Sequence, residues 1–183
     1  MLLGITGTDG AGKGTIVEYL VTHKGFLHFP ARALWEEELK KRGVESNRAN
    51  MRLVANELRA LHGDDYLVAH YLKKIQADGS KNAVIESIRT LAEVATLKKN
   101  GGVLLLIDAD PRVRYERIVA RKSASDCVTF EEFTTHEQLE MNDPNPHGMQ
   151  KAKVMEAADY TFHNNDSVEE LHQEIDEFLA THH

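Results

Sequence analysis

A glycine-rich segment near the start of the chain holds the residue types best suited to chemistry. It runs from Gly7 to Thr15 with the sequence GTDGAGKGT, between an apolar run at 2–5 and an apolar-periodic run at 16–21. This order is typical of a strand, a phosphate-binding loop and a helix, and it fits G-x-x-x-x-G-K, although Gly14 follows the lysine where a hydroxyl residue is usual. Glycines let the backbone curl until its N–H groups, together with the free N–H groups of a helix start, converge on one anion.

The glycine-rich segment predicts a site for the triphosphate tail of a nucleotide. Lys13 would contact the β- and γ-phosphates as a positive charge, and the Thr15 hydroxyl would ligate Mg²⁺. The competing interpretation is a turn that only joins a strand to a helix, which four glycines, a lysine and a threonine at this spacing disfavour. We therefore expect ATP and Mg²⁺ as cofactors, bound by Asp9, Gly10, Ala11, Gly12, Lys13, Gly14 and Thr15.

Two acidic residues compete for the place beside the metal. Asp108 follows an apolar run at 103–107, and Glu86 follows a shorter one at 83–85 with Arg89 three residues further on. Phosphoryl transfer requires such an acid near Mg²⁺ and arginines on the transferred group. We favour Glu86 as the metal-side acid together with Thr15, because Asp108 is also explained as a helix cap ahead of Pro111.

Arg89 is the first candidate for contact with an acceptor. It follows the predicted strand 83–86 and precedes a predicted helix that Thr90 would cap. Its guanidinium could bind an acceptor phosphate through two parallel hydrogen bonds. The alternative is a surface arginine paired with Glu86 or Glu93.

Three further arginines share one face of the helix predicted at 112–122. Arg114, Arg117 and Arg121 stand at i, i+3 and i+7. The plain alternative is a solvated face, but the helix leads into a polar stretch that could form a lid whose arginines exclude water from the phosphates. We favour Arg117 and Arg121 for this role and rank Arg114 lower. The predicted catalytic residues are Lys13, Arg89, Arg117 and Arg121.

The elements needed to position these residues alternate along the chain. Strands are predicted at 2–5, 26–29, 83–86, 103–107 and 160–163, with helices between them, and this pattern predicts an α/β fold with a five-stranded parallel sheet. Ligands bind such sheets at the carboxyl ends of the strands. The glycine loop, Glu86, Arg89 and Asp108 all fall there, as do Asn164 and Asn165 after the last strand.

Composition limits the class of protein. The chain has 183 residues, 42% of them apolar, which suits one domain with a full core. Its formal charge of −7 disfavours a nucleic-acid or membrane partner. The single cysteine, Cys127, permits no internal disulfide, and the chain starts without a signal-peptide pattern, so we expect a cytoplasmic protein. We expect a monomer or a homodimer that binds a small-molecule nucleotide acceptor.

The sequence resembles the P-loop nucleoside monophosphate kinase superfamily. The segment Gly7 to Thr15, in which Gly-Thr follows the lysine, is similar to the loop of adenylate kinases, and its DGAGK portion is also similar to that of thymidylate kinases. Residues 84–90, VIESIRT, resemble the acid-Gly-x-x-Arg segment of the superfamily, with Glu86 in place of Asp and Ser87 in place of Gly. Residues 108–111, 117–121, 130–133 and 158–165 resemble dephospho-CoA kinases and an archaeal group of adenylate-kinase-related proteins.

The resemblance implies strand order 2-3-1-4-5, ATP·Mg²⁺ as the donor, and Asn164 and Asn165 near the adenine. It also implies one P-loop domain with three parts. The core would comprise 1–29, 80–122 and 149–183, the helical acceptor-binding insertion 30–79, and the short lid region 123–148. The superfamily's first acceptor arginine is absent, and Arg32, Arg52 or Arg59 could replace it. We expect transfer of the γ-phosphate of ATP to a nucleoside monophosphate or related nucleotide. The alternatives are a dephospho-CoA kinase and a nucleotide-binding regulatory module with weak ATPase activity.

Overall fold

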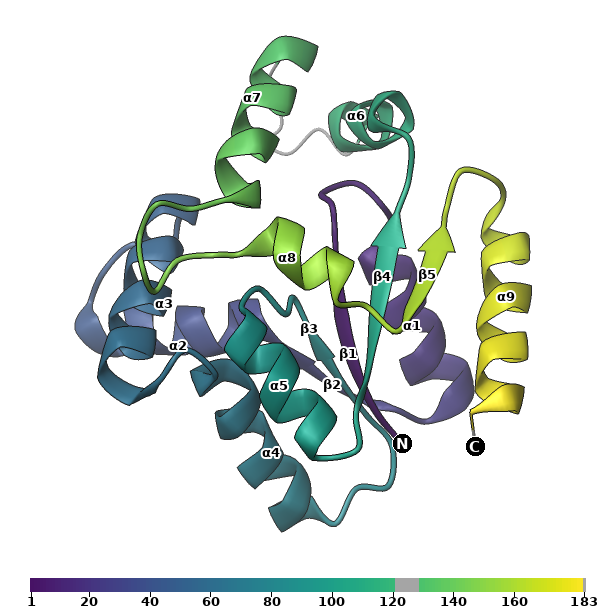
Figure 1. Cartoon of the computed structure of the whole chain (residues 1–183), viewed down its shortest axis with the longest axis horizontal. Helices are drawn as coiled ribbons and strands as arrows, with labels where there is room; N and C mark the ends of the chain where they lie inside the picture. The colour runs from purple at the N-terminus through teal and green to yellow at the C-terminus, as the bar shows by residue number, and fades with distance from the viewer. Residues whose placement is uncertain (121–128, 183) are drawn as a thin grey trace.

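A parallel sheet of five strands forms the centre of the molecule (Figure 1). The structure is a computed structural model, and it describes residues 1–120 and 129–182 except for the side chains of His136 and Leu139. The strand order is β2-β3-β1-β4-β5, as the family resemblance implied, and all four pairings are parallel, as the alternation of strands and helices predicted. The strands are β1 (Leu2–Gly7), β2 (Leu27–Pro30), β3 (Ala83–Glu86), β4 (Val103–Asp108) and β5 (Tyr160–His163).

Helices cover both faces of this sheet. On one face, α1 (Lys13–Lys24) and α9 (Val168–Thr181) pack against the side chains of Leu3, Ile5 and Leu105. On the other face, helices α4 (Tyr66–Asp78), α5 (Leu91–Lys99) and α8 (Lys151–Glu156) share a core with Ile85 and Leu104. Burial on both faces explains why the central strands read as nearly continuous apolar runs.

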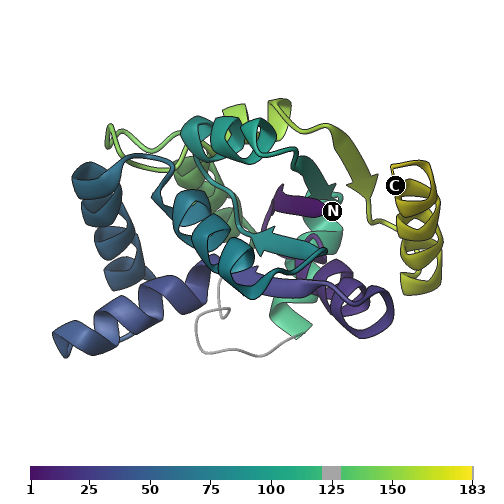
Figure 2. The same cartoon turned by 90° about the horizontal axis from the view of Figure 1, so that it is seen from below.

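The remaining helices lie around the edges of the sheet. Two of them, α2 (Ala31–Arg42) and α3 (Arg48–His62), follow β2 and extend from one side of the molecule, opposite α9 (Figure 2). Two others, α6 (Pro111–Ala120) and α7 (Phe130–Met141), stand above the carboxyl end of β4 (Figure 1). No helix within residues 1–120 and 129–182 has the length and apolar character needed to cross a membrane.

Local sequence signals account for most helix boundaries. The Thr90 hydroxyl accepts a hydrogen bond from the Glu93 backbone N–H, and the Glu93 carboxylate accepts one from Thr90 N–H, which together form the predicted cap of α5. The helix predicted at 149–158 is shorter, at Lys151–Glu156. At its start, the Met149 carbonyl oxygen accepts a hydrogen bond from Asp143 N–H, and Gln150 N–H donates to the Arg89 carbonyl oxygen. The helix therefore begins only after Gln150, whose carbonyl oxygen accepts from Val154 N–H.

Candidate phosphate-binding site

The glycine loop between β1 and α1 is held tightly from behind. Gly10 and Gly12 have φ of 81° and 98°, which favour glycine. A Cβ at Gly10 would lie 2.5 Å from the Arg114 carbonyl oxygen, and one at Gly12 would lie 2.2 Å from the Asn164 side-chain nitrogen. Ala11 between them is fully buried. The loop therefore has little freedom on its inner side, and its Ala11 N–H donates a hydrogen bond of 3.4 Å to the Thr8 carbonyl oxygen.

Lys13 bends back over this loop. Its ammonium donates hydrogen bonds to the carbonyl oxygens of Thr8, at 2.7 Å, and Gly7, at 3.2 Å, and it lies 3.8 Å from the Asp9 carboxylate. Burial, and after it the nearby Arg89 guanidinium, lower the pKa of Lys13 to about 8 against the opposing effect of Asp9. A bound anion would therefore stabilise the positively charged form of Lys13.

Asp9 lies at the centre of a group of positive charges. Its carboxylate oxygens are 3.5 Å from the Arg48 guanidinium and 3.9 Å from the Lys151 ammonium, in addition to the contact with Lys13. Burial by itself would raise the pKa of Asp9, but Lys151, Lys13, Arg89 and Arg48 together hold it well below its usual range. Asp9 is therefore ionised and acts as a counter-ion.

Lys151 and Arg48 share a second carboxylate, that of Glu140 in α7. The Lys151 ammonium is 3.2 Å and the Arg48 guanidinium 3.6 Å from the Glu140 oxygens. Lys151 is completely buried, whereas Arg48 is exposed. The sequence analysis missed all three residues. A signal for Lys151 did exist, because it falls three residues before the buried Val154 and so lies on the apolar face of its helix.

The guanidinium of Arg89 faces the loop without a carboxylate partner among the described residues. It makes one long hydrogen bond, of 3.4 Å, to the Ile88 carbonyl oxygen. Glu93, the ion-pair partner considered in the alternative interpretation, contacts the backbone N–H of Arg89 instead of its side chain. Arg89 acts electrostatically on both Asp9 and Lys13. It is thus free to bind an anion.

Both acidic candidates lie beside the loop. The Glu86 carboxylate is 2.8 Å from the His28 ring nitrogen, and this hydrogen bond is the main reason that the pKa of Glu86 is lowered. Asp108 accepts a hydrogen bond of 2.6 Å from the Thr8 hydroxyl, so its carboxylate supports the loop, which the helix-cap explanation did not anticipate. The structure thus places one acid at the end of β3 and the other at the end of β4.

The oxygen groups near the loop suit Mg²⁺. Thr15 is half-buried, and its hydroxyl makes no hydrogen bond to any residue in the described part of the chain. The hydrogen bond from His28 lowers the pKa of Glu86 and so favours its ionised form. A hydroxyl and a carboxylate are ligands that Mg²⁺ accepts, and it usually takes most of its remaining ligands from water and substrate phosphates.

The arginines of α6 brace the loop. Arg114 is buried and donates to the carbonyl oxygens of Ala109, at 2.8 Å, and Asp9, at 3.3 Å, while its guanidinium pairs with Glu137 of α7. Arg117 is half-buried and donates to the Asn164 carbonyl oxygen at 2.8 Å. The solvated-face interpretation is therefore wrong for Arg114 and Arg117. The third arginine of this face, Arg121, lies outside the described residues.

The two asparagines after β5 connect this strand to the site. The Asn164 side chain is buried and donates to the Ala11 carbonyl oxygen at 2.8 Å. Asn165 accepts a hydrogen bond of 2.7 Å from Asp110 N–H and so fixes the start of α6. Asn164 thus positions the glycine loop, in addition to any contact with an adenine.

None of the three arginines considered as replacements for the missing acceptor arginine pairs with the loop. Arg32 is exposed and pairs with Glu36, and Arg52 pairs with Asp143. Arg59 is buried against Glu93. Arg48, which we did not anticipate, is the arginine of the helical segment 30–79 that contacts Asp9. Arg48 is the first residue of α3, and its guanidinium lies 3.5 Å from the Asp9 carboxylate and 3.6 Å from that of Glu140 in α7.

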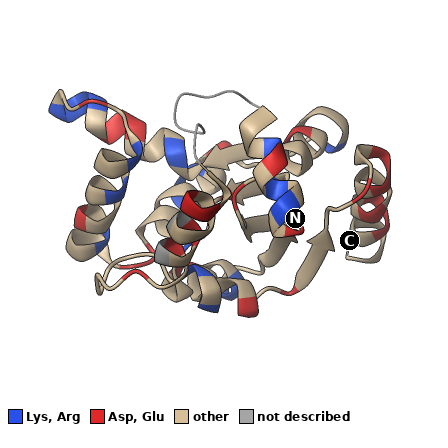
Figure 3. Ribbon diagram, turned by 90° about the horizontal axis from the view of Figure 1, so that it is seen from above, with Lys and Arg blue, Asp and Glu red and all other residues tan. Residues whose placement is uncertain are grey.

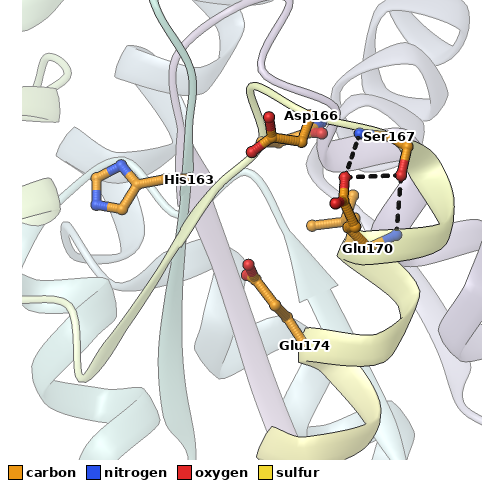
Figure 4. Close-up of a pocket in the computed structure, with 7 residues that line it drawn as sticks. His163, Asp166, Ser167, Glu170 and Glu174 are labelled. Carbon is orange, nitrogen blue, oxygen red and sulfur yellow. Dashed lines mark hydrogen bonds between the residues drawn. The ribbon is translucent and has the colours of Figure 1, made fainter.

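A second group of acidic residues lies on α9 and beside β5. Helix α9 carries five of them and no lysine or arginine, and it lies at one side of the molecule (Figure 3). A small hollow between β5 and α9 is lined in part by Asp166, Glu170 and Glu174 (Figure 4). The Glu170 carboxylate accepts hydrogen bonds from the backbone N–H and the hydroxyl of Ser167, which caps α9. Its negative lining makes this hollow unsuitable for a phosphate.

The sheet order, the glycine loop between β1 and α1 and the lysine within it define a nucleotide-binding protein with the P-loop kinase fold. Solved structures agree. TT1252 from Thermus thermophilus superposes with a TM-score of 0.63 at 25% identity, covering 99% of this chain and 97% of that one. A shikimate kinase from Bacteroides thetaiotaomicron also gives 0.63, at 17% identity and 98% coverage of both chains, which shows likeness of fold.

Sequence comparison places the chain in a family. The profile described as an AAA domain matches residues 3–142. UPF0200 protein TK1334 of Thermococcus kodakarensis is 30% identical over 181 residues, which cover 96% of this chain and 94% of that protein. A UPF0200 protein of Hyperthermus butylicus is 29% identical, with 98% and 94% covered. The chain therefore belongs to the AAA domain family and, within the P-loop nucleoside monophosphate kinase-like superfamily, to the UPF0200 group.

Proposed function

We propose that the protein is an ATP-dependent phosphotransferase that transfers the γ-phosphate to a nucleoside monophosphate or a related nucleotide. The observation that carries the proposal is the convergence of positive charge at the glycine loop. Lys13 comes from the loop itself, Arg89 follows β3, and Arg48 and Lys151 come from α3 and α8. A protein with a net charge of −7 gathers these side chains where a P-loop fold binds phosphates.

These residues suit the requirements of phosphoryl transfer. An acceptor oxygen forms a bond to the γ-phosphorus while the bond from that phosphorus to the bridging oxygen of ADP breaks, and negative charge is spread over the transferred oxygens. Lys13 and Arg89 would stabilise that charge, and Asn164 and Asn165 would lie towards the adenine. Mg²⁺, held by Thr15 and Glu86, would neutralise phosphate charge. We also propose that Arg117 and Arg121 close over the phosphates and exclude water from them.

The test is turnover with a panel of acceptors. ADP release from ATP and Mg²⁺ is measured with each common nucleoside monophosphate, dephospho-CoA and shikimate. We expect acceptor-dependent turnover with a nucleoside monophosphate, and a loss of about a hundredfold or more in Lys13→Met, because the variant lacks charge stabilisation in the transition state. Lys99→Met, at the exposed end of α5, is the matched control. Near-normal turnover in Lys13→Met would contradict the proposed mechanism.

The same panel separates the alternatives. Turnover with dephospho-CoA alone would assign the enzyme to that branch. Tight ATP binding without transfer to any acceptor, unchanged by Arg89→Ala, would favour a regulatory module with slow hydrolysis. A cytoplasmic location and a monomeric or homodimeric state accompany the proposal, and cell fractionation and sedimentation velocity test them.

A further inference from the structure

A buried ion pair joins the helical segment 30–79 to α5, the helix that follows Arg89. Arg59, in the last turn of α3, is 3% exposed, and Glu93, in the first turn of α5, is completely buried. The Arg59 Nη2 atom donates a hydrogen bond of 3.2 Å to Oε1 of Glu93. Arg59 therefore fixes the end of α3 against the start of α5.

The second carboxylate oxygen of Glu93 holds the backbone of Arg89. This oxygen, Oε2, accepts hydrogen bonds of 2.6 Å from Arg89 N–H and 3.1 Å from Thr90 N–H. A capping box needs only the bond from Thr90, so the shorter bond from Arg89 is an additional contact. The Arg89 carbonyl oxygen in turn accepts a hydrogen bond of 2.8 Å from Gln150 N–H. Both backbone groups of Arg89 are thus fixed, and its guanidinium faces the glycine loop.

Helix capping alone does not explain this ion pair. A glutamine in place of Glu93 would also complete a capping box, without a charge whose burial costs free energy. The Arg59 Nε atom is buried without a hydrogen-bond partner in the described part of the chain, which is a further cost. A carboxylate, however, holds a backbone N–H more strongly than a neutral amide does. A firm hold on Arg89 therefore explains the ion pair better than the stability of α5 does.

We propose that Arg59 is a positioning residue for Arg89. Its charge balances that of Glu93, the Glu93 carboxylate fixes the Arg89 backbone, and the Arg89 guanidinium is thereby held towards the glycine loop. The inference rests on the proposed function, in which Arg89 stabilises the transferred group, and it adds a residue that acts on the reaction only through Arg89. Such positioning matters because a displacement of about 1 Å can cost a large part of the rate.

The test is whether the ion pair acts only through Arg89. Arg59→Met/Glu93→Gln, the neutral pair, removes both charges and keeps an acceptor oxygen for the cap. It is made in the parent and in Arg89→Ala, and Arg59→Gln/Glu93→Gln replaces it if it does not fold. Val94→Ala, which truncates a buried side chain on the same helix, controls for a general loss of stability. The measurements are kcat and KM with the nucleoside monophosphate of lowest KM in the panel, the ADP dissociation constant by calorimetry, and urea unfolding.

We expect the neutral pair to lower kcat by about tenfold in the parent and to leave the ADP dissociation constant within about twofold, because the glycine loop binds the donor. Arg89→Ala by itself should lower kcat by about a hundredfold, and in that variant the neutral pair should have no further effect. Arg59→Lys should keep kcat within about threefold of the parent, because it retains the charge and the observed bond to Glu93 is a single one.

The role of Arg59 would be overturned by an unchanged kcat in the neutral pair or by an equal fall with and without Arg89. A fall in Arg59→Lys as large as in the neutral pair, or the same fall in Val94→Ala at an equal loss of stability, would also overturn it. Each of these results would leave the kinase proposal standing. No turnover of the parent with any acceptor would overturn both.

Discussion

Replacing Lys13 with methionine should change how the stability of the protein depends on pH. The pKa of Lys13 is lowered from 10.5 to about 8, chiefly by burial. Between these values the unfolded chain binds a proton at this lysine that the native protein does not, so the free energy of unfolding of the parent rises as pH increases. Lys13→Met lacks this proton in both states and therefore lacks the rise.

The magnitude follows from the difference in pKa. A shift of about 2.5 units corresponds to about 3 kcal/mol over the whole window, at about 1.4 kcal/mol per unit. About 2 kcal/mol of this appears between pH 7 and pH 9.5, the range that is practical for unfolding. The Lys13 side chain is 11% exposed, so solvent screens the effect little. The hydrogen bonds lost with the ammonium add a contribution that changes less with pH.

Urea unfolding of the parent, Lys13→Met and Lys99→Met at half-unit steps of pH measures this effect. We expect the stability of Lys13→Met relative to the parent to fall by about 2 kcal/mol from pH 7 to pH 9.5. Because Lys99 is exposed at the end of α5, its variant controls for the general loss of an amine. Identical pH courses for the two variants would refute the assignment of Lys13 as a buried, destabilised charge.

Two pairs of substitutions test the backbone of the site. Gly12→Ala should weaken ADP binding by about tenfold or more, because the new Cβ displaces Asn164 from the loop. At Gly14 a Cβ would meet open space, so Gly14→Ala should raise the free energy of unfolding by about 0.5 kcal/mol. Calorimetry and urea unfolding check the pair, and equal ADP affinities would contradict it. Ser87 has φ of 73°, so Ser87→Gly should stabilise the protein by about 0.5 to 1 kcal/mol and Ser87→Ala should not, which thermal unfolding measures.

The order of strands and helices was predictable because its signals are local. Thr90 caps α5 through Glu93, three residues away, and Asn47 caps α3 through Asn50 N–H. Such contacts depend only on neighbouring residues, and the apolar runs of β1 and β4 reflect burial on both faces of the sheet. The glycine loop was predictable for the same reason, since its φ values and the start of α1 are properties of one short segment.

Tertiary structure decided which charged residues face the loop. Nothing near Arg48 in the sequence distinguishes it from Arg52, which pairs with Asp143, or from Arg59, which is buried against Glu93. Only the packing of α3 against the segment before α8 directs Arg48 towards Asp9. A local pattern does not encode the partner of a charged side chain when that partner lies on another element.

The sequence by itself therefore determined the sheet, the phosphate loop and the position of Arg89 directly after the third strand. Backbone conformation and strand ends follow from short segments of the chain. The tertiary structure alone determined that Asp9 is surrounded by cations and that Lys151 is buried beside it. The physical reason is that electrostatic balance in a buried site depends on distance in space, which the chain sets only when it has folded.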